Sequence, residues 1–133
     1  MPAKSKKTSR KAPKSKSTPA KADLRDFCRT LPGTTEDIKW GDDLVFSVGK
    51  KMYACFDLEN PHEIGFKCDE DEFDALTEMP GIIPAPYAAK YGWVKITKRG
   101  ALSPTKLKAL ITKSHVLVAS CLPKKTQAKL GLL

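Results

Sequence analysis

The stretch LVFSVGKKMYACF, residues 44–56, determines the expected fold. Its first half is apolar at every second position, as in a strand that buries one face: Leu44, Phe46 and Val48. Gly49-Lys50 can form a two-residue turn, because glycine readily takes the positive φ that such turns need. The returning half repeats the alternation with Met52, Ala54 and Phe56. Strands joined by so short a turn pair antiparallel, so we expect an antiparallel sheet.

Segments whose apolar residues have the spacing of an amphipathic helix lie before and after this hairpin. Thr18-Pro19 predicts a helix start, and Pro32-Gly33 predicts its end. Between them the apolar residues recur at i, i+3, i+4 and i+7: Leu24, Phe27, Cys28 and Leu31. Ser103-Pro104 predicts the start of a long helix with an apolar face from Leu107 to Cys121. A shorter helix over residues 69–79 has acids in its first turn, which complement the helix dipole.

The remaining segments complete an α+β pattern. Strands are expected near residues 36–40, 63–67 and 93–97, and a further helical turn over 124–130. The proline-rich segment 80–91 is expected to be an ordered, irregular loop. We therefore predict a two-layer α+β fold, with an antiparallel sheet and helices on one of its faces. The folded domain is expected over residues 18–133.

The charge of the chain is concentrated in its first residues. The 133 residues have a formal net charge of +9, from 24 Lys and Arg and 15 Asp and Glu. Eight of the cations precede every acid: Lys4, Lys6, Lys7, Arg10, Lys11, Lys14, Lys16 and Lys21. Residues 22–133 therefore net only about +1. Residues 1–17 are expected to be a disordered basic arm that suits a polyanion, most simply DNA; the alternative is a solubility tail.

No apolar run is long enough to cross a bilayer, which takes about 18–20 residues. The basic N-terminus is not followed by the apolar region of a secretory signal. The expected location is therefore the cytoplasm. The four cysteines, Cys28, Cys55, Cys68 and Cys121, lack metal-site spacing, and we expect free thiols.

Neither metal binding nor catalysis is favoured by the sequence. The acids at 69–72 and 74 are explained more simply as a solvated helix start than as a metal site. Ser114 and His115 are neighbours on a helix, so their side chains diverge and do not form a dyad. We expect a non-enzymatic protein with no cofactor.

Six short motifs occur along the chain in this order: Leu31-Pro32-Gly33-Thr34-Thr35-Glu36, Gly49-Lys50-Lys51-Met52-Tyr53, Gly65-Phe66-Lys67, Pro84-Ala85-Pro86-Tyr87, Tyr91-Gly92-Trp93-Val94 and Ser114-His115. Their order and spacing resemble the MmcQ/YjbR-like family of small bacterial proteins over residues 22–124. The resemblance implies a compact α+β fold similar to type III secretion chaperones. It also implies DNA binding, the label commonly given to a family of unknown function. The basic arm is not part of the family pattern, and His115 stands where members often carry Tyr or Trp.

Strand alternation predicts which residues leave the core for the outer sheet face. The expected inner set is Ala54, Phe56, Ile64, Phe66, Val94 and Ile96; the outer set is Tyr53, Cys55, Gly65, Lys67, Trp93 and Lys95. Further cations lie beyond the strand ends: Lys50, Lys51, Lys98 and Arg99. Aromatic rings among cations suit stacking on bases and contacts to phosphates. In the alternative arrangement, Trp93 and Tyr53 pack under the proline-rich loop and the lysines are a solvated rim.

The sequence thus favours a small nucleic-acid-binding protein, in which the arm provides salt-sensitive affinity and the domain positions it. The alternative is a protein-interaction module that uses the outer sheet face and the Pro80–Tyr91 loop. A weaker third hypothesis is metal handling through the acidic helix.

Overall fold

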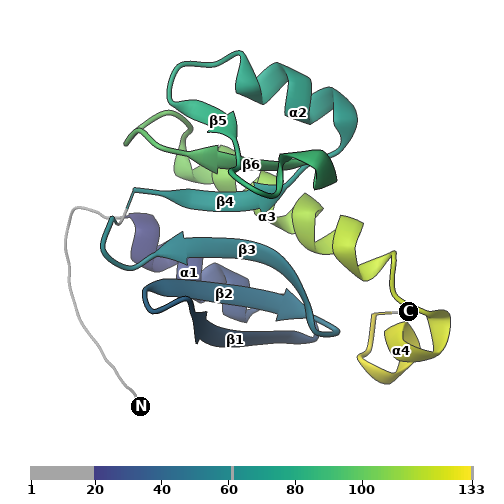
Figure 1. Ribbon diagram of the computed structural model, residues 1–133. Coiled ribbons are helices and arrows are strands. Elements are labelled where there is room, and N and C mark those ends of the chain that lie inside the picture. The colour runs from purple at the N-terminus through teal and green to yellow at the C-terminus, as the bar shows by residue number, and fades with distance from the viewer. Residues whose placement is uncertain (1–19, 61, 133) are drawn as a thin grey trace.

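The computed structural model describes residues 20–60 and 62–132, and in this part of the chain one antiparallel sheet of six strands forms the centre of the fold (Figure 1). The strand order is β1-β2-β3-β4-β6-β5. The strands are β1 (Thr34–Lys39), β2 (Asp43–Val48), β3 (Lys51–Asp57), β4 (Ile64–Lys67), β5 (Ile82–Pro84) and β6 (Trp93–Ile96). This confirms the predicted α+β class. The predicted hairpin is β2–β3, and both of its turn residues, Gly49 and Lys50, have positive φ.

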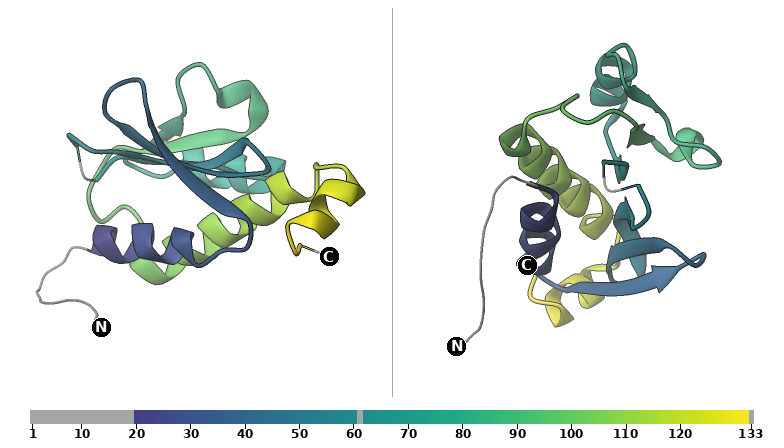
Figure 2. Two further views of the ribbon diagram at one scale, coloured as in Figure 1. Left: turned by 90° about the horizontal axis from the view of Figure 1, so that it is seen from below. Right: turned by 90° about the vertical axis from the view of Figure 1, so that its left-hand side faces the viewer.

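Two helices cover one face of the sheet, α1 (Ala20–Arg29) and α3 (Pro104–Ala119) (Figure 2). The helix α2 (Glu70–Thr77) lies at the β5 edge, and α4 (Lys124–Lys129) follows α3. The predicted cap of α3 is present: the Lys106 amide donates to the Ser103 hydroxyl at 3.1 Å. Asp69 caps α2 in the same way, accepting from the Glu72 amide at 2.8 Å. Both caps satisfy amides that a helix start leaves without a partner.

The core lies between the inner sheet face and these helices. Phe46, Phe56 and Phe66 are fully buried there, at the positions that strand alternation predicts. Phe46 and Phe56 meet edge to face with ring centroids 5.7 Å apart, a favoured aromatic geometry. Leu24 and Cys28 of α1 complete the layer, as the helical spacing predicts. The alternation of the hairpin and the spacing of α1 therefore both identify core residues correctly.

A β-bulge in β3 changes the predicted faces of two residues. Phe46 pairs with Ala54 but Ser47 pairs with Met52, so Tyr53 is the extra residue. Tyr53 is turned toward the helices and fully buried; its hydroxyl donates to the Cys28 carbonyl at 3.1 Å. The prediction that Tyr53 lies on the outer face is therefore wrong. Met52, predicted to face inward, lies on the outer face instead, because a bulge shifts the alternation by one residue.

The segment 80–91 contains more regular structure than predicted. Residues Ile82–Pro84 form β5, which pairs with β6, and Ala89–Tyr91 form a 3₁₀ turn, η2. The prediction of an irregular loop throughout was wrong here. A three-residue edge strand is hard to find from sequence, and Pro84 is tolerated because an edge strand has one free side.

Other predictions fall at the ends of the described chain. The expected arm over residues 1–17 and the Thr18-Pro19 helix start lie outside the described residues. The last long helix ends at Ala119, so Cys121, predicted on its apolar face, is exposed. Over residues 20–60 and 62–132, the helices are all too short or too polar to cross a membrane.

Candidate ligand-binding pocket on the outer sheet face

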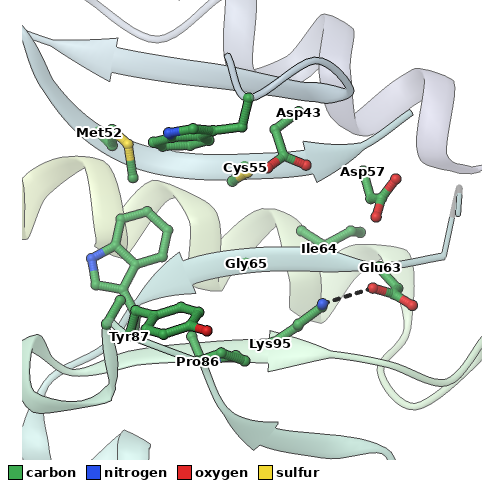
Figure 3. Close-up of a pocket in the computed structure, with 14 residues that line it drawn as sticks. Asp43, Met52, Cys55, Asp57, Glu63, Ile64, Gly65, Pro86, Tyr87 and Lys95 are labelled. Atoms are coloured by element: carbon green, nitrogen blue, oxygen red, sulfur yellow. Dashed lines mark ion pairs between the residues drawn. The ribbon is translucent and has the colours of Figure 1, made fainter. Parts of the chain in front are cut away.

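The sheet face opposite the helices carries a pocket of about 590 Å³ (Figure 3). Its floor contains four residues that alternation places on the outer face: Cys55, Gly65, Trp93 and Lys95. Met52, brought to this face by the bulge, adds to the floor. The volume falls within the range of about 300–1,000 Å³ that is usual for ligand sites. The prediction of which residues lie on the outer face is therefore correct except at the bulge, and these residues form the floor of a pocket.

Two raised segments form the rims of this pocket. The β1–β2 turn contributes Trp40, and the segment after β5 contributes Pro86 and Tyr87. Figure 2 shows both segments projecting from the sheet on the side away from α1 and α3. Trp40 is 69% exposed and Tyr87 is fully exposed, so each rim presents an aromatic ring to solvent.

The rim aromatics have an uncommon backbone conformation. Trp40 has a φ of 52° and Tyr87 has a φ of 67°. Positive φ is an outlier for bulky side chains and is frequent at binding sites. Sequence reasoning missed Trp40 and included Tyr87 only as part of the Pro80–Tyr91 loop, since turns with positive φ normally use Gly or Asn. For Trp40, the sequence signal that could have indicated this site is an aromatic residue directly before Gly41 in a turn.

Trp93 lies deep in the pocket, with 8% of its surface exposed. Its ring lies over Gly65, where an added Cβ would be 3.7 Å from the ring. The segment above is bound to its backbone, because the Ala85 amide donates to the Trp93 carbonyl at 3.0 Å. The proline-rich segment is thus bonded to the backbone of Trp93, whereas Tyr53 lies in the core.

Carboxylates gather at one end of the pocket, where Figure 3 shows Asp43, Asp57 and Glu63 beside Lys95. Lys95 Nζ lies 2.8 Å from Glu63 Oε1, and this bond raises the pKa of the lysine. Burial, and then the charge of Asp57, raise the pKa of Asp43. Burial opposes ionisation of Asp57, but hydrogen bonds from Asn60 and Glu59 outweigh it and lower the pKa of this carboxyl. The pocket lining therefore carries more negative than positive charge.

The family model for YjbR matches residues 29–117. The chain belongs to the YjbR family. The crystal structure of the Deinococcus radiodurans protein DR2400, with the domain DUF419, is similar at 30% identity and a TM-score of 0.74, covering 84% of this chain and 88% of that one. A Pseudomonas syringae protein matches with 24% identity and a TM-score of 0.59, covering 73% and 97%, and is alike in fold alone. A search of curated proteins found no match.

The cations that the sequence suggests for nucleic-acid binding lie in different parts of this YjbR domain. Trp93 and Lys95 are the two members in the pocket. Lys67 donates to the Tyr91 carbonyl at 2.9 Å. Two exposed pairs lie at opposite ends of the sheet: Lys50 and Lys51 at the β2–β3 turn, and Lys98 and Arg99 after β6. The predicted arm residues lie outside the described chain: Lys4, Lys6, Lys7, Arg10, Lys11, Lys14 and Lys16.

The other polar residues considered from the sequence have structural partners in the YjbR fold. His115 Nε2 is 2.7 Å from the Pro32 carbonyl oxygen, and Ser114 bonds to the backbone of β3. Asp69 and Glu72 of the acidic helix both pair with Lys113. Within residues 20–60 and 62–132, no group of His, Cys, Asp and Glu is arranged to hold a metal ion. The four cysteines are free thiols.

Proposed function

We propose that this YjbR domain is a non-enzymatic binding module whose outer-face pocket receives a segment of a partner protein. The observation that carries the proposal is a pocket of about 590 Å³ between two exposed aromatic rims, Trp40 and Tyr87. Exposed Trp and Tyr are enriched at protein interfaces, because each combines a large apolar surface with a polar group. The function is thus assigned to the sheet face and the segment 80–91.

The chemistry of the pocket lining supports binding over catalysis. Cys55 is the one thiol in the lining, and burial raises its pKa to about 12, so it stays protonated near neutral pH. Neither His62 nor His115 lines the pocket, and the described lining contains no serine or threonine. An activated cysteine has a lowered pKa, whereas burial and then the charges of Asp43 and Asp57 raise the pKa of Cys55.

Intrinsic fluorescence provides a direct test, because the chain has two tryptophans and both line the pocket. We expect capped peptides from a random library to change the emission of the full-length protein on binding. Tyr87→Gly removes a rim ring and suits the positive φ, so it should weaken binding by about 2 kcal/mol or more, as for an interface hot spot.

The matched control is Tyr91→Ala, because Tyr91 is 59% exposed, belongs to the same segment and does not line the pocket. Equal peptide affinity for the wild-type protein and Tyr87→Gly would contradict the proposed binding site. Loss of binding in Tyr91→Ala alone would place the contact elsewhere on the segment.

Nucleic-acid binding is a second candidate, supported by a basic end of the domain. The β2–β3 turn lies beside the start of α4, since a Cβ on Gly49 would meet the Leu122 side chain. This end holds five exposed lysines: Lys50, Lys51, Lys124, Lys125 and Lys129. No ion pair within the described part of the chain involves them. Together with the arm, they would form a polycationic surface suited to phosphates.

Salt-titrated DNA binding tests this second candidate on the full-length chain. If n cations contact phosphates, log K should fall with log salt at a slope of about −0.9n. Replacing the eight cations of residues 1–21 with glutamine should lower both the affinity and the slope. Unchanged values would remove the arm from DNA binding; the same replacement of the five lysines tests the basic end separately.

A further inference from the structure

We propose that the pocket selects a basic segment of a partner protein, with a lysine or arginine side chain between the rim aromatics and its charge at the Asp43–Asp57 end. This inference rests on the proposed function, since it names the chemistry of the segment that the pocket receives. It is carried by the charges and rings that line one and the same cavity.

The charges of the lining leave a place for one more cation. Three carboxylates line the pocket, Asp43, Asp57 and Glu63, and Lys95 is the one cation of the lining among the described residues. Lys95 is already paired with Glu63 at 2.8 Å. Asp57 accepts hydrogen bonds from the Asn60 and Glu59 amides, but these donors are neutral. Among the described residues, neither Asp43 nor Asp57 has a cation within ion-pair distance, and the one charge of Lys95 is shared by all three carboxylates.

Asp43 is the carboxylate that a ligand would compensate most. In residues 20–60 and 62–132, no hydrogen bond or ion pair reaches its side chain. It is partly buried, and a buried carboxylate gains more from a cation than an exposed one, because water screens the pair less. Burial and then the neighbouring Asp57 raise the pKa of Asp43, and the charge of Lys95 offsets this only in part.

The rest of the lining fits the stem of a long basic side chain. Three aromatic rings belong to the cavity: Trp40, Tyr87 and Trp93. Cations bind favourably over aromatic faces, and arginine does so most often. Met52 and Pro86 supply apolar surface for the methylene groups, which lysine and arginine bury while their charge stays at a polar edge. A phosphate would instead meet the three carboxylates, so polyanions are disfavoured at this face.

The experiment uses four libraries of capped hexapeptides with the same random flanks and one fixed central residue: arginine, lysine, norleucine or glutamate. Norleucine keeps the apolar stem of lysine without its charge. Tryptophan emission of the full-length protein measures binding at low and at physiological salt. We expect the arginine and lysine libraries to bind at least about tenfold tighter than the norleucine library, and the glutamate library to bind weakest.

Asp43→Asn is the decisive variant, and it should reduce the preference for arginine or lysine over norleucine to less than about threefold. It should fold as well as the wild type, since burial and the charge of Asp57 already make the ionised form of this carboxyl less favourable and raise its pKa; thermal melting checks this. Asp74→Asn is the control, because it removes the same charge from an exposed position on α2 outside the pocket.

The results distinguish failure of the proposed binding site from failure of the proposed selection of a basic side chain. Equal affinity for all four libraries, with binding still lost in Tyr87→Gly, would overturn the selection of a cation and keep the binding site. Binding that is unaffected by Tyr87→Gly would overturn the site itself. If the basic libraries bind only after the cations of residues 1–21 are replaced with glutamine, the occupant is the arm of the chain and a partner segment is refuted.

Discussion

Ser114→Ala should destabilise the fold far more than the loss of one hydroxyl at the surface would. Ser114 is fully buried on α3, and its hydroxyl donates to the Tyr53 carbonyl at 2.6 Å. The same oxygen accepts from the Lys67 amide at 3.0 Å. The β3–β4 ladder continues to the pair Ala54 and Phe66, and its register would next join Tyr53 to Lys67. At the bulge, the serine hydroxyl replaces that direct strand-to-strand contact.

The size of the effect follows from the two backbone groups that alanine would leave without a partner. Each buried polar group that loses its hydrogen bond costs about 1–3 kcal/mol. The Lys67 amide is partly buried, so water can recover some of its share. We therefore expect a loss of about 2–4 kcal/mol, a large part of the total stability of about 5–15 kcal/mol for a small domain.

Urea unfolding measures this loss as a lower midpoint with an unchanged slope, which indicates a change of stability alone. Ser120→Ala is the matched control, because its hydroxyl bonds to the Leu117 carbonyl at the exposed end of the same helix. It should change stability by less than about 0.5 kcal/mol. A loss below about 1 kcal/mol for Ser114→Ala would refute the role of the serine in joining β3 to β4.

Three further perturbations test the structure. Tyr53→Phe removes the hydroxyl that donates to the Cys28 carbonyl, and we expect a loss of about 1–2 kcal/mol in thermal or urea unfolding. Alkylation followed by mass spectrometry should modify the exposed Cys121 first, because burial raises the pKa of the other three thiols to about 12; equal rates would contradict this. The hydrogen bond from Arg29 lowers the pKa of Glu36 from 4.5, so its stabilisation is present above pH 4.5 and is lost as the pH falls below it. The stability of Glu36→Gln should therefore decline less on acidification than that of the wild type. The same decline in both proteins would contradict the stabilising role of the Arg29–Glu36 pair.

The sequence predicts those parts of the fold that depend on near neighbours along the chain. The β2–β3 hairpin has its own turn glycine, and α3 has its own cap in Ser103. The inner face follows from alternation, because each strand must bury one side. Local signals of this kind need no knowledge of what lies across the sheet.

The features that the sequence did not predict depend on residues far apart in the chain. The bulge at Tyr53 is completed by Ser114, 61 residues later. The charge of Lys95 is offset by Glu63 on the neighbouring part of the sheet. The sequence predicts an outer sheet face rich in cations, but the pocket on this face is lined by more acidic than basic residues. The rim residues Trp40 and Tyr87 have backbone angles that sequence preferences assign to Gly or Asn.

The two candidate interactions use surfaces of opposite charge, and this makes them separable. The arm and the lysines beside α4 would attract phosphates, whereas the excess of carboxylates over cations in the pocket lining would attract a basic side chain. Added salt weakens both interactions and so does not distinguish them. Substitutions do: Asp43→Asn should leave DNA affinity unchanged while it reduces the preference for basic peptides. Replacing the arm cations should lower DNA affinity and should not weaken peptide binding, because peptide binding is assigned to the carboxylates and rings of the pocket. A variant that lowers both affinities together would show that one surface serves both ligands, and the separation drawn from the charges would then be wrong.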